Sequence, residues 1–112
     1  MRIATWNVNS VRTRAERIAA FLEREDVDVL AMQETKTADD KFPYATFEAA
    51  GYEVAHVGVS QWNGVAIASR VGLDNVRDSF ERQPAFAKKG DPSVEARAVG
   101  AVCGGVDVWS LY

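Results

Sequence analysis

The sequence predicts an α/β protein, and three observations support that prediction. Residues 3–8 and 27–32 are short apolar runs, and an amphipathic stretch lies between them. Strand, helix and strand within about thirty residues form a βαβ unit, whose two strands run parallel. Near the C-terminus, residues 94–102 and 106–112 flank two glycines, which predicts a β-hairpin.

The apolar spacing defines the first elements. After the first strand, apolar residues recur at helical spacing up to residue 25, and Asn9 or Ser10 is the expected N-cap. The residues at this spacing are Val11, Ala15, Ile18 and Leu22. Residues 27–32 are almost wholly apolar, as in a strand covered on both faces. A short helix is predicted over 44–50, ending at Gly51.

The remaining segments predict strands separated by turns. Residues 52–59 alternate weakly and 65–68 are apolar, with a turn at 62–64 between them. Residues 83–93 hold two of the three prolines and have no periodicity, so we expect a mobile surface loop. The strand at 106–112 reaches the last residue without a polar exit, which favours a fragment of a larger domain.

The composition is that of an ordinary globular protein. The chain has 112 residues, of which 47% are hydrophobic and 26% charged, which fits one domain at most. The net charge of −3 argues against binding to nucleic acid through a general positive field. A local patch is the alternative, and four basic residues near the first two strand ends suit it: Arg12, Arg14, Arg17 and Lys36.

Targeting features point to the cytoplasm. No apolar run is long enough to span a bilayer, and Met1 leads into the first strand without a signal-peptide pattern. We therefore expect a cytoplasmic protein with no membrane partner. The single Cys103 cannot form an internal disulfide, and we expect it to be a small buried residue.

Two polar residues, Asn7 and Glu34, lie at the ends of the first two apolar runs. Open α/β sheets carry their chemistry beyond the carboxyl ends of strands, and parallel strands place both residues at one edge. A carboxylate there suits Mg²⁺, which retains several waters and takes one or two protein carboxylates. The alternatives are an ion pair of Glu34 with Lys36 or Arg12, and a turn hydrogen bond for Asn7.

Five segments form an ordered pattern. They are Thr5-Trp6-Asn7-Val8-Asn9-Ser10-Val11-Arg12, Leu30-Ala31-Met32-Gln33-Glu34-Thr35-Lys36, residues 62–70, Glu95-Ala96-Arg97 and Trp109-Ser110-Leu111-Tyr112. Together they resemble the exonuclease III and apurinic/apyrimidinic (AP) endonuclease family, within the endonuclease/exonuclease/phosphatase superfamily. The resemblance covers residues 1–112 and implies a four-layer α/β sandwich of the DNase I-like kind. This chain would be its N-terminal half, roughly the first sheet with its helices, and alone would expose an apolar face prone to aggregate.

The resemblance also implies roles at the site. Glu34 would bind Mg²⁺, with Mn²⁺ as the alternative metal, and Asn7 would orient the scissile phosphate or a catalytic partner. Tyr112 would reach the target phosphate. Arg97 would brace that part of the site.

Further residues would support the metal or contact DNA. Lys36 would belong to the shell of the metal site, and Arg12 would lie near the DNA backbone. Asn9 stands where some relatives carry Asp, so we expect at most a weak metal contact from its uncharged amide. Trp62 and Asn63 would lie on a DNA-contacting loop, with a packed tryptophan as the favoured alternative for Trp62.

The implied reaction is hydrolysis of a DNA phosphodiester 5′ to an abasic site or at a 3′ end. The partners would be double-stranded DNA and the C-terminal half of the same fold, in a family that is usually monomeric. Because the family's water-activating residues belong to that second half, we expect the isolated chain to be inactive. His56 is expected to be a structural or surface histidine, not the family's catalytic one. The alternatives are another phosphodiesterase or phosphatase of the superfamily, and a non-catalytic DNA- or metal-binding module.

Overall fold

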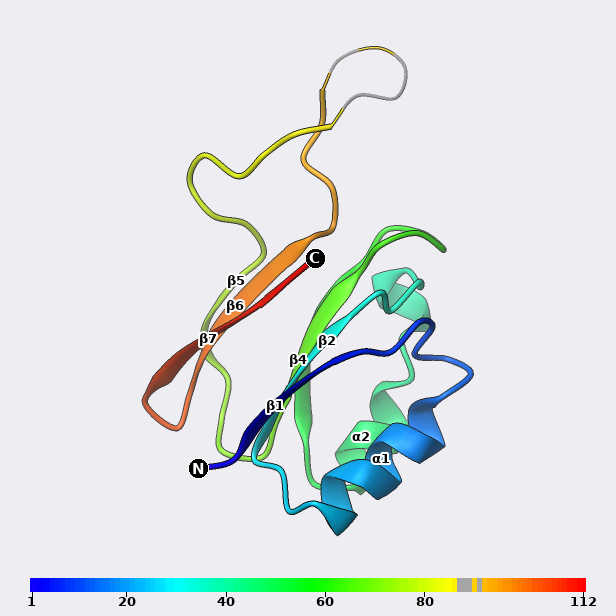
Figure 1. Cartoon of the computed structure of the whole chain (residues 1–112), viewed down its shortest axis with the longest axis vertical. Helices are drawn as coiled ribbons and strands as arrows, with labels where there is room; N and C mark the ends of the chain where they lie inside the picture. The colour runs from blue at the N-terminus through cyan, green and yellow to red at the C-terminus, as the bar shows by residue number, and fades with distance from the viewer. Residues whose placement is uncertain (87–89, 91) are drawn as a thin grey trace.

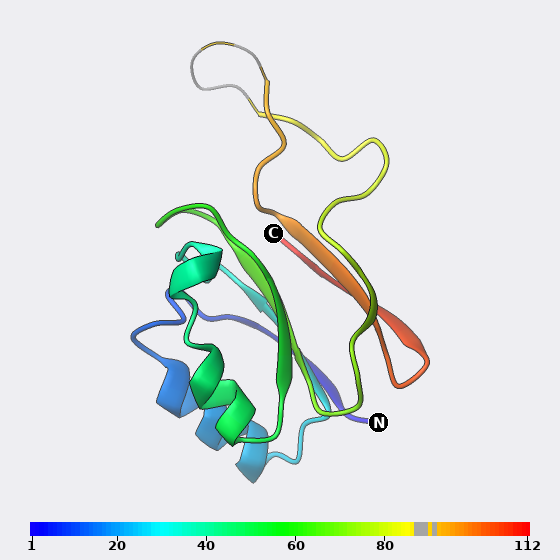
Figure 2. The same cartoon turned by 180° about the vertical axis from the view of Figure 1, so that it is seen from behind.

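The computed structural model describes residues 1–86, 90 and 92–112, and these form three layers (Figure 1). Helices α1 (Ala15–Arg24) and α2 (Tyr44–Ala49) cover one face of a four-stranded sheet. A three-stranded sheet covers the other face, as Figure 2 shows from behind. The first sheet has the order β1 (Ile3–Asn7), β2 (Val29–Gln33), β4 (Val65–Ser69), β3 (Glu53–Val57). The second has the order β5 (Asp74–Arg77), β6 (Ala98–Cys103), β7 (Val106–Leu111).

The predicted βαβ unit is confirmed by the pairing of β1 with β2. The two strands run parallel, with Ile3 opposite Val29 and Asn7 opposite Gln33. Beyond the pair, the Val8 N–H still donates to the Gln33 carbonyl at 2.9 Å. The loops that follow the two strands therefore leave from the same edge of the sheet.

Two apolar cores hold the layers together. Alternate residues of β2 point to opposite faces, so that Leu30 and Met32 pack under the helices while Val29 faces the second sheet. Residues from both sheets form the second core: Val29, Ala55, Val65, Ile67, Val99, Ala101, Cys103 and Val108. The prediction of a strand covered on both faces is confirmed, and Cys103 is free and buried as predicted.

The second sheet corrects the expected architecture. The α/β class is confirmed, but the chain builds two sheets where the sequence predicted one sheet with its helices. The inner face of the first sheet is therefore covered by β6 and β7, not exposed as expected. Strand β5 was not predicted because Asp74–Arg77 is polar and largely exposed, and lacks apolar alternation.

A polar bridge also joins the two sheets. The Gln33 side-chain amide donates to the Ser110 hydroxyl and to the Thr5 hydroxyl, each at 3.0 Å. Ser110 in turn donates to the Met32 carbonyl at 2.6 Å. The end of β7 is thereby attached to the carboxyl end of β2.

The start of α1 differs from the prediction. The helix begins at Ala15, and neither Asn9 nor Ser10 caps it; Arg14 is the N-cap residue and makes no capping side-chain bond. Asn9 and Ser10 have left-handed φ values of 45° and 88°. The N–H groups of Ser10 and Val11 donate to carbonyls of the loop after β2, so tertiary contacts replace the predicted first helical turns.

The other boundaries are close to those predicted. Gly51, with φ of 92°, follows α2, and Gly104 and Gly105 have the positive φ values of a tight hairpin. Strand β6 begins at Ala98, not at residue 94, and just before it the Ala96 carbonyl accepts the Gly64 N–H of the turn before β4 at 3.0 Å.

A short 3₁₀ turn, η1 (Asp39–Lys41), was not predicted. Residues 87–89 and 91 of the predicted loop over 83–93 lie outside the described residues. In the described part of the chain, no helix is long and apolar enough to cross a membrane.

The inter-sheet core predicts a large difference between two valine truncations. Val99→Ala is expected to lower the free energy of unfolding by about 2 kcal/mol, from lost methyl burial and a residual cavity. Val59→Ala is the matched control, because Val59 is 78% exposed. Its expected change is below about 0.5 kcal/mol. Urea denaturation measures both, and equal effects would contradict the described packing.

Candidate functional site

Polar side chains meet where β1 and β2 end. The Asn7 amide donates to Glu34 Oε1 at 2.8 Å, and Lys36 Nζ lies 3.4 Å from Glu34 Oε2. Lys36 also donates to Asn9 Oδ1 at 2.6 Å. The ion pair with Lys36 and a turn hydrogen bond from the Asn9 N–H to Asn7 Oδ1, at 3.2 Å, are both present. Asn7, Asn9, Glu34 and Lys36 thus form one polar cluster.

The backbone of this cluster is strained. Glu34 and Lys36 both have φ of 54°, in the left-handed region that costs a non-glycine residue about 1–3 kcal/mol. Thr35 lies between them, and its N–H and carbonyl bond the Gly64 carbonyl and the Val11 N–H at 3.1 and 3.0 Å. The loop after β2 is therefore held between the loops on either side of it.

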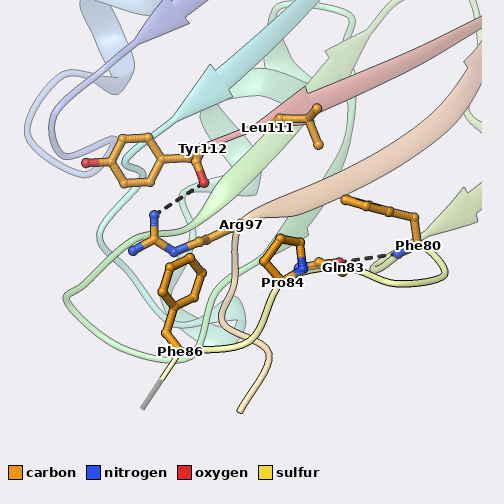
Figure 3. Close-up of a pocket in the computed structure, with 7 residues that line it drawn as sticks. All are labelled: Phe80, Gln83, Pro84, Phe86, Arg97, Leu111 and Tyr112. Carbon is orange, nitrogen blue, oxygen red and sulfur yellow. Dashed lines mark hydrogen bonds between the residues drawn. The ribbon is translucent and has the colours of Figure 1, made fainter. Parts of the chain in front are cut away.

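Tyr112 approaches this cluster from the second sheet. Tyr112 follows β7 and lies two residues after Ser110, whose side chain faces the first sheet. Because side chains two residues apart lie on the same face of a strand, the Tyr112 side chain also faces the first sheet. Figure 3 shows the hydroxyl of Tyr112 pointing away from a small apolar pocket and the Arg97 guanidinium lying between two rings. The guanidinium carbon is 4.6 Å from the Phe86 ring centre and 5.2 Å from that of Tyr112.

Arg97 is attached to the main chain of Tyr112 as well. Its guanidinium donates to the Tyr112 carbonyl at 3.3 Å, and the Tyr112 N–H donates to the Arg97 carbonyl at 2.9 Å. Glu95 Oε1 accepts a bond from Arg97 Nε at 2.9 Å. These contacts fix the last residue of the chain against β6.

The cluster sets the charge states of Glu34 and Tyr112. The Asn7 amide most strongly, then the Tyr112 phenol and Lys36, hold the pKa of Glu34 below its usual value, although partial burial opposes them. The same carboxylate raises the pKa of the Tyr112 phenol. Near neutral pH, Glu34 is therefore an ionised acceptor and Tyr112 a protonated donor.

A basic pocket adjoins the cluster. Arg12, Lys36 and Lys41 line a cavity of about 370 Å³ together with Trp62. Trp62 is 61% exposed, so the interpretation of a packed tryptophan is wrong. Asn63 lies beside it with φ of 58°, and its carbonyl accepts the Lys36 N–H at 2.9 Å.

Of the four basic residues singled out in the sequence, Arg12 and Lys36 line this pocket. Lys41 was missed, because only the unpredicted turn η1 brings it there. Its one sequence signal is a positive charge within a polar loop, which is too common to single out a site.

The fold and the cluster define an α/β protein of two packed sheets with a polar site beyond the ends of β1 and β2. The chain belongs to the endonuclease/exonuclease/phosphatase family, whose model matches residues 4–98. Within this family, its relatives in sequence and structure are exonuclease III- and AP endonuclease-like nucleases, which it matches over their N-terminal part.

Individual relatives agree with this assignment. The exodeoxyribonuclease III of Haemophilus influenzae is 34% identical over 89 residues, which are 80% of this chain and 33% of that protein. An AP endonuclease from Archaeoglobus fulgidus superimposes with a TM-score of 0.87 and 38% identity, and a 3′-5′ exonuclease from Neisseria meningitidis with 0.86 and 34%. Each covers 100% of this chain, which spans 41% of each. The chain thus spans well under half the length of these relatives.

The contact between Asn7 and Glu34 predicts a change in acid titration. Asn7→Ala removes the leading donor, so we expect the pKa of Glu34 to rise towards its usual value. Because folding lowers this pKa, Glu34 stabilises the fold above its unfolded pKa, and that contribution is lost as pH falls through the folded pKa. In Asn7→Ala, the stability of the fold is therefore expected to fall less as the pH is lowered through the pKa of Glu34.

NMR titration of the Glu34 side-chain carbon measures the shift. Gln61→Ala, at an exposed position, is the control with no expected change. An unaltered pKa of Glu34 in Asn7→Ala would show that the amide does not stabilise the carboxylate.

Proposed function

We propose that this chain is the N-terminal half of a Mg²⁺-dependent DNA repair nuclease of the exodeoxyribonuclease III or AP endonuclease type. The observation that carries the proposal is the convergence of Asn7, Lys36 and Tyr112 on the ionised carboxylate of Glu34. The reaction is hydrolysis of a DNA phosphodiester, at an abasic site or a 3′ end. The family assignment supports this chemistry.

The donors at the site suit Mg²⁺. Among the described residues, no three His, Cys, Asp or Glu side chains are grouped so that they could hold a metal ion, so they form no closed protein cage. Mg²⁺ commonly uses one or two carboxylates and fills its other positions with water and substrate phosphate. Glu34 is ionised and half-buried, and its two oxygens retain free lone pairs beside the bonds from Asn7 and Lys36. Mn²⁺ suits the same oxygen ligands.

Each residue has a role consistent with its contacts. Bound Mg²⁺ would neutralise phosphate charge and stabilise the leaving oxygen. Asn7 holds the Glu34 carboxylate and orients the phosphate, while Tyr112 donates its phenolic hydrogen bond to a phosphate oxygen. Lys36 supports the carboxylate, and Arg97 braces Tyr112. The Asn9 amide contributes at most a weak metal contact.

The basic pocket would bind the DNA backbone. Arg12, Lys36 and Lys41 supply three positive charges to one cavity, although the whole chain is acidic. Trp62 lines the pocket, Asn63 follows it in the chain, and both would contact DNA. A Neisseria 3′ phosphatase bound to a product DNA hairpin is 35% identical to this chain, which makes removal of a 3′ phosphate the second candidate activity.

The rest of the fold would complete the enzyme. Among the described strands, β1 and β7 each have one hydrogen-bonded neighbour, so each leaves an edge that further strands can join. We infer that the C-terminal half of a four-layer sandwich is the partner and supplies the group that activates water. The 112-residue chain alone would be inactive, and the whole enzyme a cytoplasmic monomer.

Glu34→Gln tests the proposed metal ligand. In the full-length protein, Mg²⁺-dependent nicking of a duplex with one abasic site is expected to fall about a hundredfold, because the carboxylate charge is lost. Glu48→Gln removes an exposed carboxylate on α2 and is expected to leave the rate unchanged. Equal rates in the wild type and Glu34→Gln would remove Glu34 from the site.

Lys41→Ala tests the basic pocket. Loss of one phosphate contact is expected to weaken binding to duplexes of any sequence and to reduce the salt slope of the binding constant by about one. Arg24→Ala, at an exposed position on α1, is the charge-matched control. Fluorescence anisotropy at several salt concentrations measures both. An unchanged slope in Lys41→Ala would place the DNA elsewhere.

A further inference from the structure

A buried histidine lies next to the strained loop of the site. The His56 side chain, on β3, has no exposed area. Its Nδ1 lies 2.7 Å from Asp39 Oδ1, and its Nε2 lies 2.8 Å from the Thr35 hydroxyl. Asp39, His56 and Thr35 are thus in contact one after another, and Thr35 lies between Glu34 and Lys36 in the chain.

The chemistry of the three groups fixes the tautomer of His56 and the direction of its hydrogen bond with Thr35. His56 Nδ1 faces Asp39 Oδ1 at 2.7 Å, but the two atoms are not aligned as a hydrogen bond. A carboxylate oxygen accepts, so the position of Asp39 Oδ1 beside Nδ1 favours the tautomer of His56 with its proton on Nδ1. The Nε2 of a neutral ring then accepts from the Thr35 hydroxyl. Burial lowers the pKa of His56, and this effect exceeds the opposing influence of Asp39, so the ring is neutral. The Asp39 oxygen also accepts the Gly58 N–H at 3.0 Å.

Two glycines and one aromatic ring pack closely around the histidine and the threonine. A Cβ atom at Gly58 would lie 2.5 Å from His56 Cε1, and one at Gly64 would lie 2.1 Å from the Thr35 hydroxyl oxygen. The Phe42 ring centre is 4.5 Å from that of His56 on another side. A side chain at Gly64 would therefore displace the Thr35 hydroxyl, and one at Gly58 would meet both His56 and the Thr37 carbonyl.

Thr35 is the point at which this arrangement meets the site. Its side chain points inward to His56, whereas Glu34 and Lys36 on either side adopt left-handed φ and remain partly exposed. The Thr35 main chain is bonded to Gly64 and Val11, so the hydroxyl is its remaining anchor. Rotation of this peptide segment would move both the carboxylate and the ammonium group.

We infer that His56 is a positioning residue that, with Asp39, anchors the Thr35 hydroxyl and thereby holds Glu34 and Lys36 in place. It does not touch the reacting atoms. The inference rests on the proposed function in taking Glu34 as the metal ligand, but the anchoring of the loop can be measured without metal.

The first test removes the hydroxyl at constant shape. In the purified full-length protein, Thr35→Val is expected to raise the Mn²⁺ concentration at half-saturation about tenfold, as loss of an outer-shell partner commonly does. The maximal rate at saturating metal is expected to change much less. Exchange of the Lys36 amide hydrogen is expected to accelerate in metal-free protein. Thr35→Ser retains the hydroxyl and is expected to restore both values.

A second pair of variants separates the two contacts of His56, one with Thr35 and one with Asp39. His56→Gln places an acceptor near the Nε2 position and retains the bond from Thr35, whereas His56→Asn places a donor near Nδ1 and retains only Asp39. We expect His56→Gln to bind Mn²⁺ more tightly than His56→Asn. This pair also serves if Thr35→Val fails to fold.

Ser69→Ala controls for general loss of stability. Ser69 is buried at the opposite end of β4, and its hydroxyl accepts the Val71 N–H at 3.1 Å. The inference is overturned if Thr35→Val keeps wild-type Mn²⁺ binding and Lys36 amide exchange. It is also overturned if Thr35→Ser or Ser69→Ala weakens Mn²⁺ binding as much as Thr35→Val does. If Glu34→Gln leaves Mn²⁺ binding intact, the proposed function fails separately, and the metal-free exchange still decides the role of His56.

Discussion

The parallel register of β1 and β2 is the constraint on which the rest of the site depends. Asn7 is opposite Gln33 in this register. Glu34, which follows Gln33, therefore lies within hydrogen-bonding distance of the Asn7 amide. The loops after the two strands then bond to each other through main-chain groups of Ser10 and Val11. Two residues far apart in the sequence become neighbours through strand pairing alone, before any side-chain packing is considered.

Local patterns in the sequence predicted the elements that are defined by local patterns. The βαβ unit, the short helix before Gly51 and the glycine hairpin follow from apolar periodicity and from backbone preferences of glycine. The meeting of Asn7 and Glu34 was predictable because parallel strands share a carboxyl edge. Strand β5 and the first turns before α1 were not, since partners distant in the sequence determine both.

The same distinction applies to the site. Lys41 and the contact between Thr35 and His56 arise where η1 and β3 approach the loop after β2, and no spacing in the sequence encodes that approach. The exposure of Trp62 also depends on tertiary structure, because an apolar side chain in a turn is consistent with either a buried or an exposed position. The sequence therefore identified the residues at the strand ends, but not Lys41 or the contact between His56 and Thr35.

The polar bridge from Gln33 to Ser110 has a consequence for how the two sheets align. Alternation of apolar residues excludes a slip of β7 by one residue but tolerates a slip by two, which preserves the inward face. Such a slip would move Tyr112 by about 7 Å along the strand direction and would leave the Gln33 amide and the Met32 carbonyl without their Ser110 partner. Together with the tight hairpin to β6, this serine opposes an alignment that hydrophobic packing alone would tolerate, and so helps to fix how far the terminal phenol extends.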